Sequence, residues 1–277
     1  MAQLQKCESS ARMTFMQTTN LKPQKVENRN ANASTSIEKM FEAGAHYGYG
    51  KSRRHPSVSS YIYATKNNSD IIDLEKTSVM LEEATEFVKN LGAQNKIILF
   101  VGTKPEARDI IKNEASNLNM PYVNIRWIGG TLSNFTEIKK RIIELEKYNK
   151  ESVEGGLEKY TKKERVVMAK KMEKLSRYYG GLISLKKTPD ALFVIDPKAE
   201  HIAATEAKKS DVPVVALVNS DSNIKDINYP IVGNDSGILS IKFFTASIAD
   251  AYKKGLMSLP IKPARPDNDS GRSGGEK

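Results

Sequence analysis

Two short segments combine cationic, aromatic and glycine residues in a spacing that suits contact with a polyanion. The first, Gly44–Pro56, holds the candidate contact residues His46, Tyr49, Lys51, Arg53, Arg54 and His55. The second contains Arg126, Trp127 and Asn134, with paired glycines after the chain's only tryptophan. Arginine and aromatic rings stack on unpaired bases, and glycine lets a backbone approach a sugar-phosphate chain. These residue types indicate RNA contact, although Trp127 could instead be core and the glycines could serve only a sharp turn.

The positive charge of the chain is concentrated in one stretch. Among 277 residues there are 43 Lys and Arg and 33 Asp and Glu, for a net charge of +10. Residues 133–188 hold 15 of the basic and 8 of the acidic residues, whereas 61–132 and 189–257 are slightly acidic. Further candidate contacts are Lys66, Lys104, Lys139, Lys140 and Arg141. A near-neutral body with a basic projection favours a polyanionic partner, since lysine and arginine release counterions from phosphates; a merely solvated lysine-rich surface is the alternative.

Several kinds of chemistry find no support in the residues. A single cysteine, Cys7, excludes an intrachain disulfide and a multi-cysteine zinc site, and three scattered histidines do not suggest a metal cluster. No helix-turn-helix or zinc-finger pattern indicates DNA. The longest apolar runs fall far short of the roughly 20 residues that cross a bilayer. We therefore expect no metal, no cofactor, no DNA and no membrane as partners.

The sequence also offers no catalytic constellation. Gly102 stands between an apolar run and a helix start, but without dinucleotide-fold or Walker spacing, so we expect it to serve a tight turn. Asp196 and Asp221 follow apolar runs, where catalytic carboxylates occur, yet aspartate there is also an ordinary helix cap, which we prefer. His201 has no identifiable nucleophile beside it. We predict no catalytic residues.

The elements that must position these residues alternate between strand and helix over residues 37–257. Apolar runs predict strands at 97–101, 122–125, 191–195, 212–218 and 231–232, with helices at 75–91, 106–118, 199–209 and 236–254. Before them we expect a short helix at 36–44 and two short strands, 61–64 and 71–74, around a turn. Helices between successive strands imply crossover connections, so the predicted fold class is α/β with a doubly wound parallel sheet.

An insertion at about residues 133–182 follows a different pattern. Its apolar residues recur at heptad-like steps in two series: Phe135, Ile138, Ile142 and Leu145, then Met168, Met172, Leu175, Tyr179 and Leu182. Thr161 and Glu164 form a capping-box pattern that starts the second series. We predict a coiled-coil hairpin of two helices with lysines on its outer faces.

The two ends of the chain lack a hydrophobic period. We expect residues 1–36 to be a disordered N-terminal arm, although a transit peptide or a start placed too far upstream are alternatives. Residues 258–277 read as a disordered C-terminal tail.

Seven stretches, taken together and in order, carry a family resemblance. They are Phe41–Gly48, Ile71–Thr77, Ile98–Lys104, Asn124–Phe135, Leu157–Glu164, Pro189–Asp196 with His201 and Glu206, and Gly233–Asp235. They resemble the small-subunit ribosomal protein S-two family of the bacterial or organellar type. The chain departs from the family pattern in the basic loop, where Gly48-Tyr49 stands for the usual Gly-His and Arg54-His55-Pro56-Ser57 for Trp-Asn-Pro-Lys.

That resemblance implies a flavodoxin-like parallel sheet with a protruding coiled-coil hairpin. It also implies a non-catalytic structural role in translation, in which the protein binds 16S-type rRNA between the head and body of the small subunit. Neighbouring small-subunit proteins are implied partners, and the mRNA-capturing protein S-one is another in bacteria. The implied location is the small ribosomal subunit in the cytoplasm, with a mitochondrion or plastid as the alternative.

Two other readings of the residues remain open. A nucleotide- or sugar-phosphate-binding enzyme would use the same doubly wound sheet, because ligands bind at the carboxyl ends of such strands. A coiled-coil scaffold for other proteins would use the hairpin without any RNA.

Overall fold

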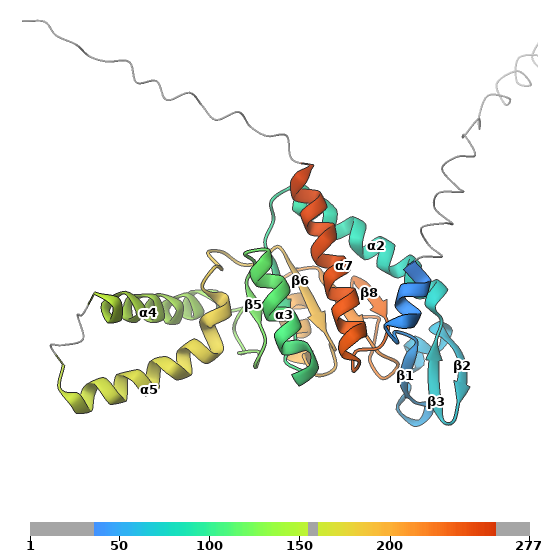
Figure 1. Cartoon of the computed structure of the whole chain (residues 1–277), viewed down its shortest axis with the longest axis horizontal. Helices are drawn as coiled ribbons and strands as arrows, with labels where there is room; N and C mark the ends of the chain where they lie inside the picture. The colour runs from blue at the N-terminus through green and yellow to red at the C-terminus, as the bar shows by residue number, and fades with distance from the viewer. Residues whose placement is uncertain (1–35, 155–159, 259–277) are drawn as a thin grey trace, which may run out of the picture.

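A five-stranded parallel sheet forms the centre of the computed structural model, which describes residues 36–154 and 160–258 (Figure 1). Its strands are β4 (Ile98–Val101), β5 (Tyr122–Val123), β6 (Ala191–Ile195), β7 (Val214–Val218) and β8 (Tyr229–Val232). They pair in the order β5-β4-β6-β7-β8, and every pair is parallel. Counted along the chain, this is the 2-1-3-4-5 order of flavodoxin-like folds. The predicted fold class is confirmed.

Helices cover both faces of this sheet because its side chains alternate between two apolar layers. The helices are α2 (Leu74–Ala93), α3 (Pro105–Asn117), α6 (His201–Lys209) and α7 (Ile238–Met257). Phe100 and Phe193 point to the layer that α2, α3 and α7 cover, and α3 and α7 lie in front of the sheet in Figure 1. Leu99 and Leu192 point to the opposite layer, which α6 and the root of the insertion cover. The central strands β4, β6 and β7 are therefore buried along their whole length, as their continuous apolar runs predict, whereas the edge strands β5 and β8 are buried only in part.

A small antiparallel sheet precedes the parallel one. It consists of β1 (Tyr47–Gly50), β2 (Ile62–Lys66) and β3 (Ser69–Ile72) in the order β1-β3-β2, with the 3-10 helices η1 (Lys51–Arg53) and η2 (Pro56–Tyr61) between β1 and β2. Asn67 and Asn68 join β2 to β3 with φ angles of 50° and 62°, the conformation of a tight hairpin turn. The hairpin matches the prediction, whereas β1 falls where the sequence indicated only a loop.

The insertion contains two helices, α4 (Phe135–Val153) and α5 (Lys162–Tyr179), followed by the 3-10 turn η4 (Gly180–Leu182). The predicted capping box at Thr161 and Glu164 is present. Ile142 and Met172 are buried, but the helices diverge away from the sheet, as Figure 1 shows, and Val167 on α5 is 61% exposed. The predicted coiled coil is not confirmed, because the apolar contact between the helices is concentrated near their root.

The remaining boundaries lie within one to three residues of the predictions. A first helix occupies residues 36–42, and Gly44, in the turn that follows, has a φ of 70°, which suits glycine. No helix within residues 36–154 and 160–258 is long and apolar enough to cross a membrane. The expected disordered arm and tail lie, except for Ser36 and Ser258, outside the described residues.

Candidate nucleic-acid interface

The carboxyl ends of β4 and β6 form the point of the sheet at which doubly wound folds bind ligands. Here Lys104 occupies that point, with its Nζ 2.6 Å from an Oδ2 of Asp196 and 2.6 Å from an Oδ2 of Asp235. Asn219 Nδ2 donates to the other oxygen of Asp235 at 2.7 Å. Burial alone would lower the pKa of Lys104, but attraction from Asp235 and hydrogen bonds to both carboxylates outweigh it, so the pKa is raised. The lysine therefore stays protonated, and the carboxylates of Asp196 and Asp235 already balance its positive charge.

Gly102, next to this cluster, and Asp196, a member of it, also have structural roles. Gly102 has a φ outside the left-handed region, but a Cβ there would lie 3.0 Å from Ile111 Cγ1, so packing of α3 against the sheet requires the glycine. This corrects the expectation that the residue serves a tight turn. Asp196 accepts hydrogen bonds from the N–H groups of Lys198 and Ala199 at 3.1 and 3.3 Å, so it caps the turn that leads into α6; the expectation that it caps the helix is wrong, because Glu200 is the N-cap residue of α6.

The basic loop after β1 is fastened to the parallel sheet by its backbone and by Tyr49. The Tyr49 N–H donates to Ser220 Oγ at 2.9 Å, and its hydroxyl lies 2.6 Å from Ser236 Oγ. The His55 N–H donates to the Ser220 carbonyl at 2.8 Å. Arg53 stays exposed, with its guanidinium carbon 5.8 Å from the centre of the Tyr49 ring, and Lys51 is exposed beside it. The loop therefore presents two cations from a fixed backbone.

Several candidate contact residues are engaged by other groups of the protein instead. Arg54 forms an ion pair with Asp70, whose side chain is fully buried, and its Nε donates to Asp70 Oδ2 at 2.7 Å. Trp127 is 5% exposed and belongs to the core beneath the sheet. The half-buried His46 ring stacks on Phe41 and lies tilted against Tyr47, two rings that are themselves largely exposed, and burial lowers the pKa of His46. RNA contact by these three residues stays a prediction. Each of them makes contacts within the protein that are enough to explain its residue type.

The corner between the sheet and the insertion is held by a carboxylate that the sequence did not single out for this role. Gly130 has a φ of 92°, which a residue with a side chain adopts only under strain. Its N–H donates to Glu206 Oε1 at 2.6 Å, and the Leu132 N–H donates to Glu206 Oε2 at 3.1 Å. Two backbone N–H groups that a sugar-phosphate chain could have used as donors are therefore already bonded to Glu206. Arg126 and Asn134 remain exposed at the corner.

The insertion carries cations of two kinds. Lys140 pairs with Glu137 at 2.6 Å and Arg141 with Glu144 at 3.2 Å, both within α4. Within the described ranges, other exposed lysines of the two helices form no ion pair: Lys139, Lys150, Lys162, Lys163, Lys170 and Lys174. Lys66, at the end of β2, is likewise exposed. The sequence predicted the charge excess of the insertion, and the structure shows which cations lack an internal counterion.

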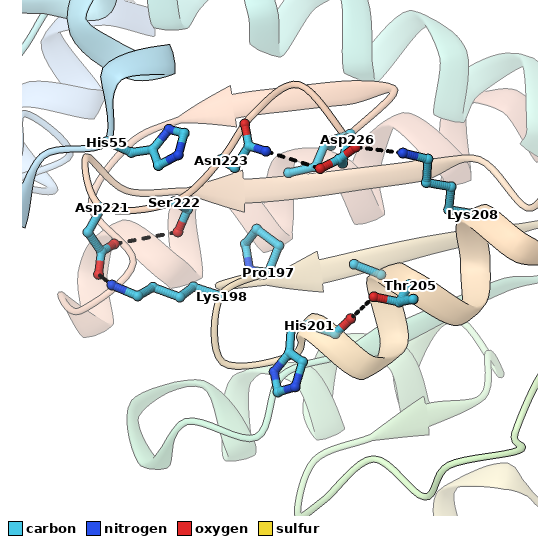
Figure 2. A pocket seen from close by; sticks show the side chains of 12 residues that line it. His55, Pro197, Lys198, His201, Thr205, Lys208, Asp221, Ser222, Asn223 and Asp226 are labelled. Atoms are coloured by element: carbon cyan, nitrogen blue, oxygen red, sulfur yellow. Dashed lines mark hydrogen bonds and ion pairs between the residues drawn. The ribbon is translucent and has the colours of Figure 1, made fainter.

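A cavity of about 500 Å³ lies beside the carboxyl ends of β6 and β7, where the enzyme alternative would place its ligand (Figure 2). Lys198 pairs with Asp221 at 2.8 Å, and Lys208 pairs with Asp226 at 2.6 Å. His55 and His201 reach the cavity from the basic loop and from α6. Because both lysines are neutralised by carboxylates, the cavity offers no surplus positive charge for a phosphate.

Comparison with protein families agrees with this arrangement. The family model described as Ribosomal protein S2 matches residues 40–255, a range that includes both sheets, the corner and the insertion. The match covers well over half of the 277 residues. The chain therefore belongs to the ribosomal protein S2 family, a family of structural, non-enzymatic proteins of the small ribosomal subunit.

Proposed function

We propose that this protein binds the rRNA of the small ribosomal subunit through the exposed cations of its insertion, its basic loop and Arg126. One observation carries the proposal: six exposed lysines of α4 and α5 have no ion pair in the described ranges, whereas Lys104 and Arg54 are compensated by buried carboxylates. Uncompensated surface cations gain free energy by displacing counterions from phosphates without breaking any contact of their own. Non-catalytic support of translation follows from such binding.

The proposed contacts are directed at phosphates rather than at bases. Six to ten such contacts would lower affinity by about 10³- to 10⁵-fold between 50 and 200 mM salt. The experiment measures binding of the full chain to small subunits depleted of this protein over that salt range. A nearly flat dependence would contradict the proposal.

A matched pair of variants localises the binding surface. K162Q/K163Q/K170Q removes three exposed charges from α5, and K89Q/K242Q/K254Q removes three exposed charges from α2 and α7. We expect the first variant to lower the slope of log K against log salt by up to about 2 to 3 units, because each lost phosphate contact accounts for about 0.7–0.9. The control should keep the wild-type slope. Equal slopes in both variants would remove α5 from the interface.

The partners are tested by sedimentation with and without ribonuclease. We expect rRNA and neighbouring small-subunit proteins to be the partners, so association should be lost on ribonuclease treatment. Association that survives digestion but requires the insertion would favour the scaffold alternative. Two further points stay predictions: that the protein binds protein S-one, and that it resides in a bacterial cytoplasm as opposed to an organelle. The protein composition and the source compartment of particles that contain the wild-type chain can test them.

A thermal-shift screen with nucleotides and sugar phosphates tests the enzyme alternative. A ligand at 100 times its dissociation constant would stabilise the protein by about 2.7 kcal/mol. Because the lysines of the cavity in Figure 2 are paired with carboxylates, we expect no such shift.

A further inference from the structure

A second cavity lies at the root of the insertion, where α4 and α5 leave the body of the molecule (Figure 1). Its volume is about 370 Å³. Ile128 from the corner and Leu175 from α5 line it, together with the rings of Tyr178 and Tyr179. This root cavity is thus aromatic and apolar inside, although it lies in the most basic part of the chain.

The remaining lining residues of the root cavity are cations. Arg141 lies on α4, and Lys171 and Lys174 lie on α5. Glu144 contacts two of them but offsets only one positive charge: its carboxylate is 2.5 Å from Lys171 Nζ and 3.2 Å from Arg141 Nη1. Lys174 forms no ion pair with any residue in the described ranges. The cavity therefore combines apolar and aromatic walls with a net positive rim.

We propose that the root cavity receives a single unpaired nucleotide of the RNA, with its base against Tyr178 and its phosphate near Lys174. The inference rests on the proposed rRNA binding and names what one part of that surface recognises. Unpaired bases are recognised by stacking on aromatic side chains, and a neighbouring cation holds the phosphate. A cavity of this volume is at the small end of ligand sites, which suits one nucleotide and not a helix.

Of the two tyrosines, Tyr178 is the one whose ring is available. Tyr179 packs against the core beneath the sheet, so its duty is structural. Tyr178 is outside that core, and the Arg177 guanidinium carbon lies 6.0 Å from the centre of its ring. An arginine beside an aromatic ring supplies a second planar group for stacking and a further charge for phosphate.

The test compares the full-length variants Y178A, Y178F and K174Q, with Y63A as the matched control. Tyr63 is 78% exposed on β2, away from the insertion, so its loss removes an aromatic ring without touching the cavity. Affinity for small subunits depleted of this protein is measured from 50 to 200 mM salt. We expect Y178A to weaken binding by about 5- to 150-fold, the effect of losing one stacked base, with an unchanged salt slope.

The other variants separate stacking from charge. Y178F keeps the ring and should bind as the wild type does, and Y63A should also match it. K174Q should reduce the salt slope by about 0.7–0.9, as the loss of one phosphate contact does. Ultraviolet cross-linking should then join one nucleotide to a peptide containing residue 178 in the wild type.

Three results would overturn the inference: wild-type affinity for Y178A, weakening by Y178A and Y63A alike, or a cross-link from residue 178 to another ribosomal protein. The thermal unfolding temperatures of free Y178A and free wild type are compared to show whether the variant is folded. If Y178A unfolds at a lower temperature, its affinity is not used, and the partner of the wild-type cross-link at residue 178 decides whether the inference holds. Failure of the wild type itself to show salt-dependent binding would instead contradict the proposed function, so the two failures are distinguishable.

Discussion

The antiparallel sheet and the helical insertion both carry basic candidate residues, but they hold their charges in opposite ways. In the antiparallel sheet, Arg54 is bound by the buried Asp70, and the loop beside it is fastened through Ser220. In the insertion, the pair between Lys171 and Glu144 has side chains that are 56% and 32% exposed. A charge excess alone therefore does not identify the residues that contact RNA. Cations paired with buried carboxylates are fixed within the protein, whereas cations that are exposed or paired only at the surface can bind a partner.

The difference follows from the apolar area that each region can bury. Only Val58 and Ile72 of the antiparallel sheet region, with Val232, form its own buried cluster among the described residues, so polar anchors to the parallel sheet hold it in place. The insertion buries Ile138, Ile142, Leu145 and Met172, and most of the other side chains of its two helices face solvent. One region should present cations from a rigid position, and the other should present them from side chains that can adapt to a partner.

The largest effect should come from removing Lys104, the cation that links two carboxylates at the carboxyl ends of the parallel strands. Lys104→Met leaves Asp196 and the fully buried Asp235 without their counterion. Breaking a buried pair from one side costs about 3–5 kcal/mol, so urea unfolding should show a loss of that size. A double variant, K104M/D235N, should recover part of the stability because it removes one orphaned charge. A loss under 1 kcal/mol in K104M would show that the cluster is not an anchor.

A smaller, pH-dependent effect is expected at Asp70. The hydrogen bond from Arg54 holds the pKa of Asp70 below its usual value. The folded state then binds this proton less tightly than the unfolded state, so the stabilisation is complete above about pH 4 and is lost as the pH falls through the folded pKa. D70N should lower stability by about 1.5–3 kcal/mol at neutral pH, and its deficit relative to wild type should shrink in acid.

Urea unfolding at several pH values measures this, with E144Q in the insertion as the control. The hydrogen bond from Lys171 lowers the pKa of Glu144 in the same direction, but that pair is largely solvated. We expect E144Q to alter the pH dependence far less than D70N does. Equal effects of the two variants would contradict the distinction between fixed and available charges.

The parallel sheet could be predicted from the sequence because its signals are local. Ala191–Ile195 is a continuous apolar run with the bounds that the structure gives β6, and β4 begins one residue from its prediction. β1 could not be predicted, since Tyr47–Gly50 contains two glycines, which disfavour strands. Its strand conformation comes from pairing with β3, a contact between distant segments that no local pattern reveals.

The candidate site was predictable in its residue types but not in its pairings. The sequence located the basic loop, the corner and the basic insertion, but it did not separate Lys104 from the lysines of α5. The carboxylate of Asp235 is 131 residues from Lys104 along the chain, so only the fold brings them together. Glu206 was likewise missed as the anchor of Gly130, because a lone carboxylate on a helix gives no sign that it faces a backbone turn.

The corner marks the border between the parallel sheet and the insertion, and Gly130→Ala tests how firmly it is fixed. At a φ of 92°, a Cβ strains the backbone by about 1–2 kcal/mol. We expect stability to fall by that amount. Replacement of Gly129, whose φ is not in the left-handed region, is the matched control and should cost less. If both alanine variants unfold alike, the Glu206 clamp does not depend on the turn conformation.

The smallest effect should follow from Lys171→Met, the same substitution as in K104M but applied to the exposed pair between α4 and α5. Exposed ion pairs contribute about 0–1 kcal/mol, because water solvates both charges when the pair is broken. Urea unfolding should therefore show a loss within that range, several-fold below that of K104M. This comparison holds residue type and substitution constant and varies the burial of the pair and the number of its carboxylates, two for Lys104 and one for Lys171. A loss above about 2 kcal/mol would mean that this contact holds the helices together, and that the insertion is fixed by polar anchors much as the antiparallel sheet is.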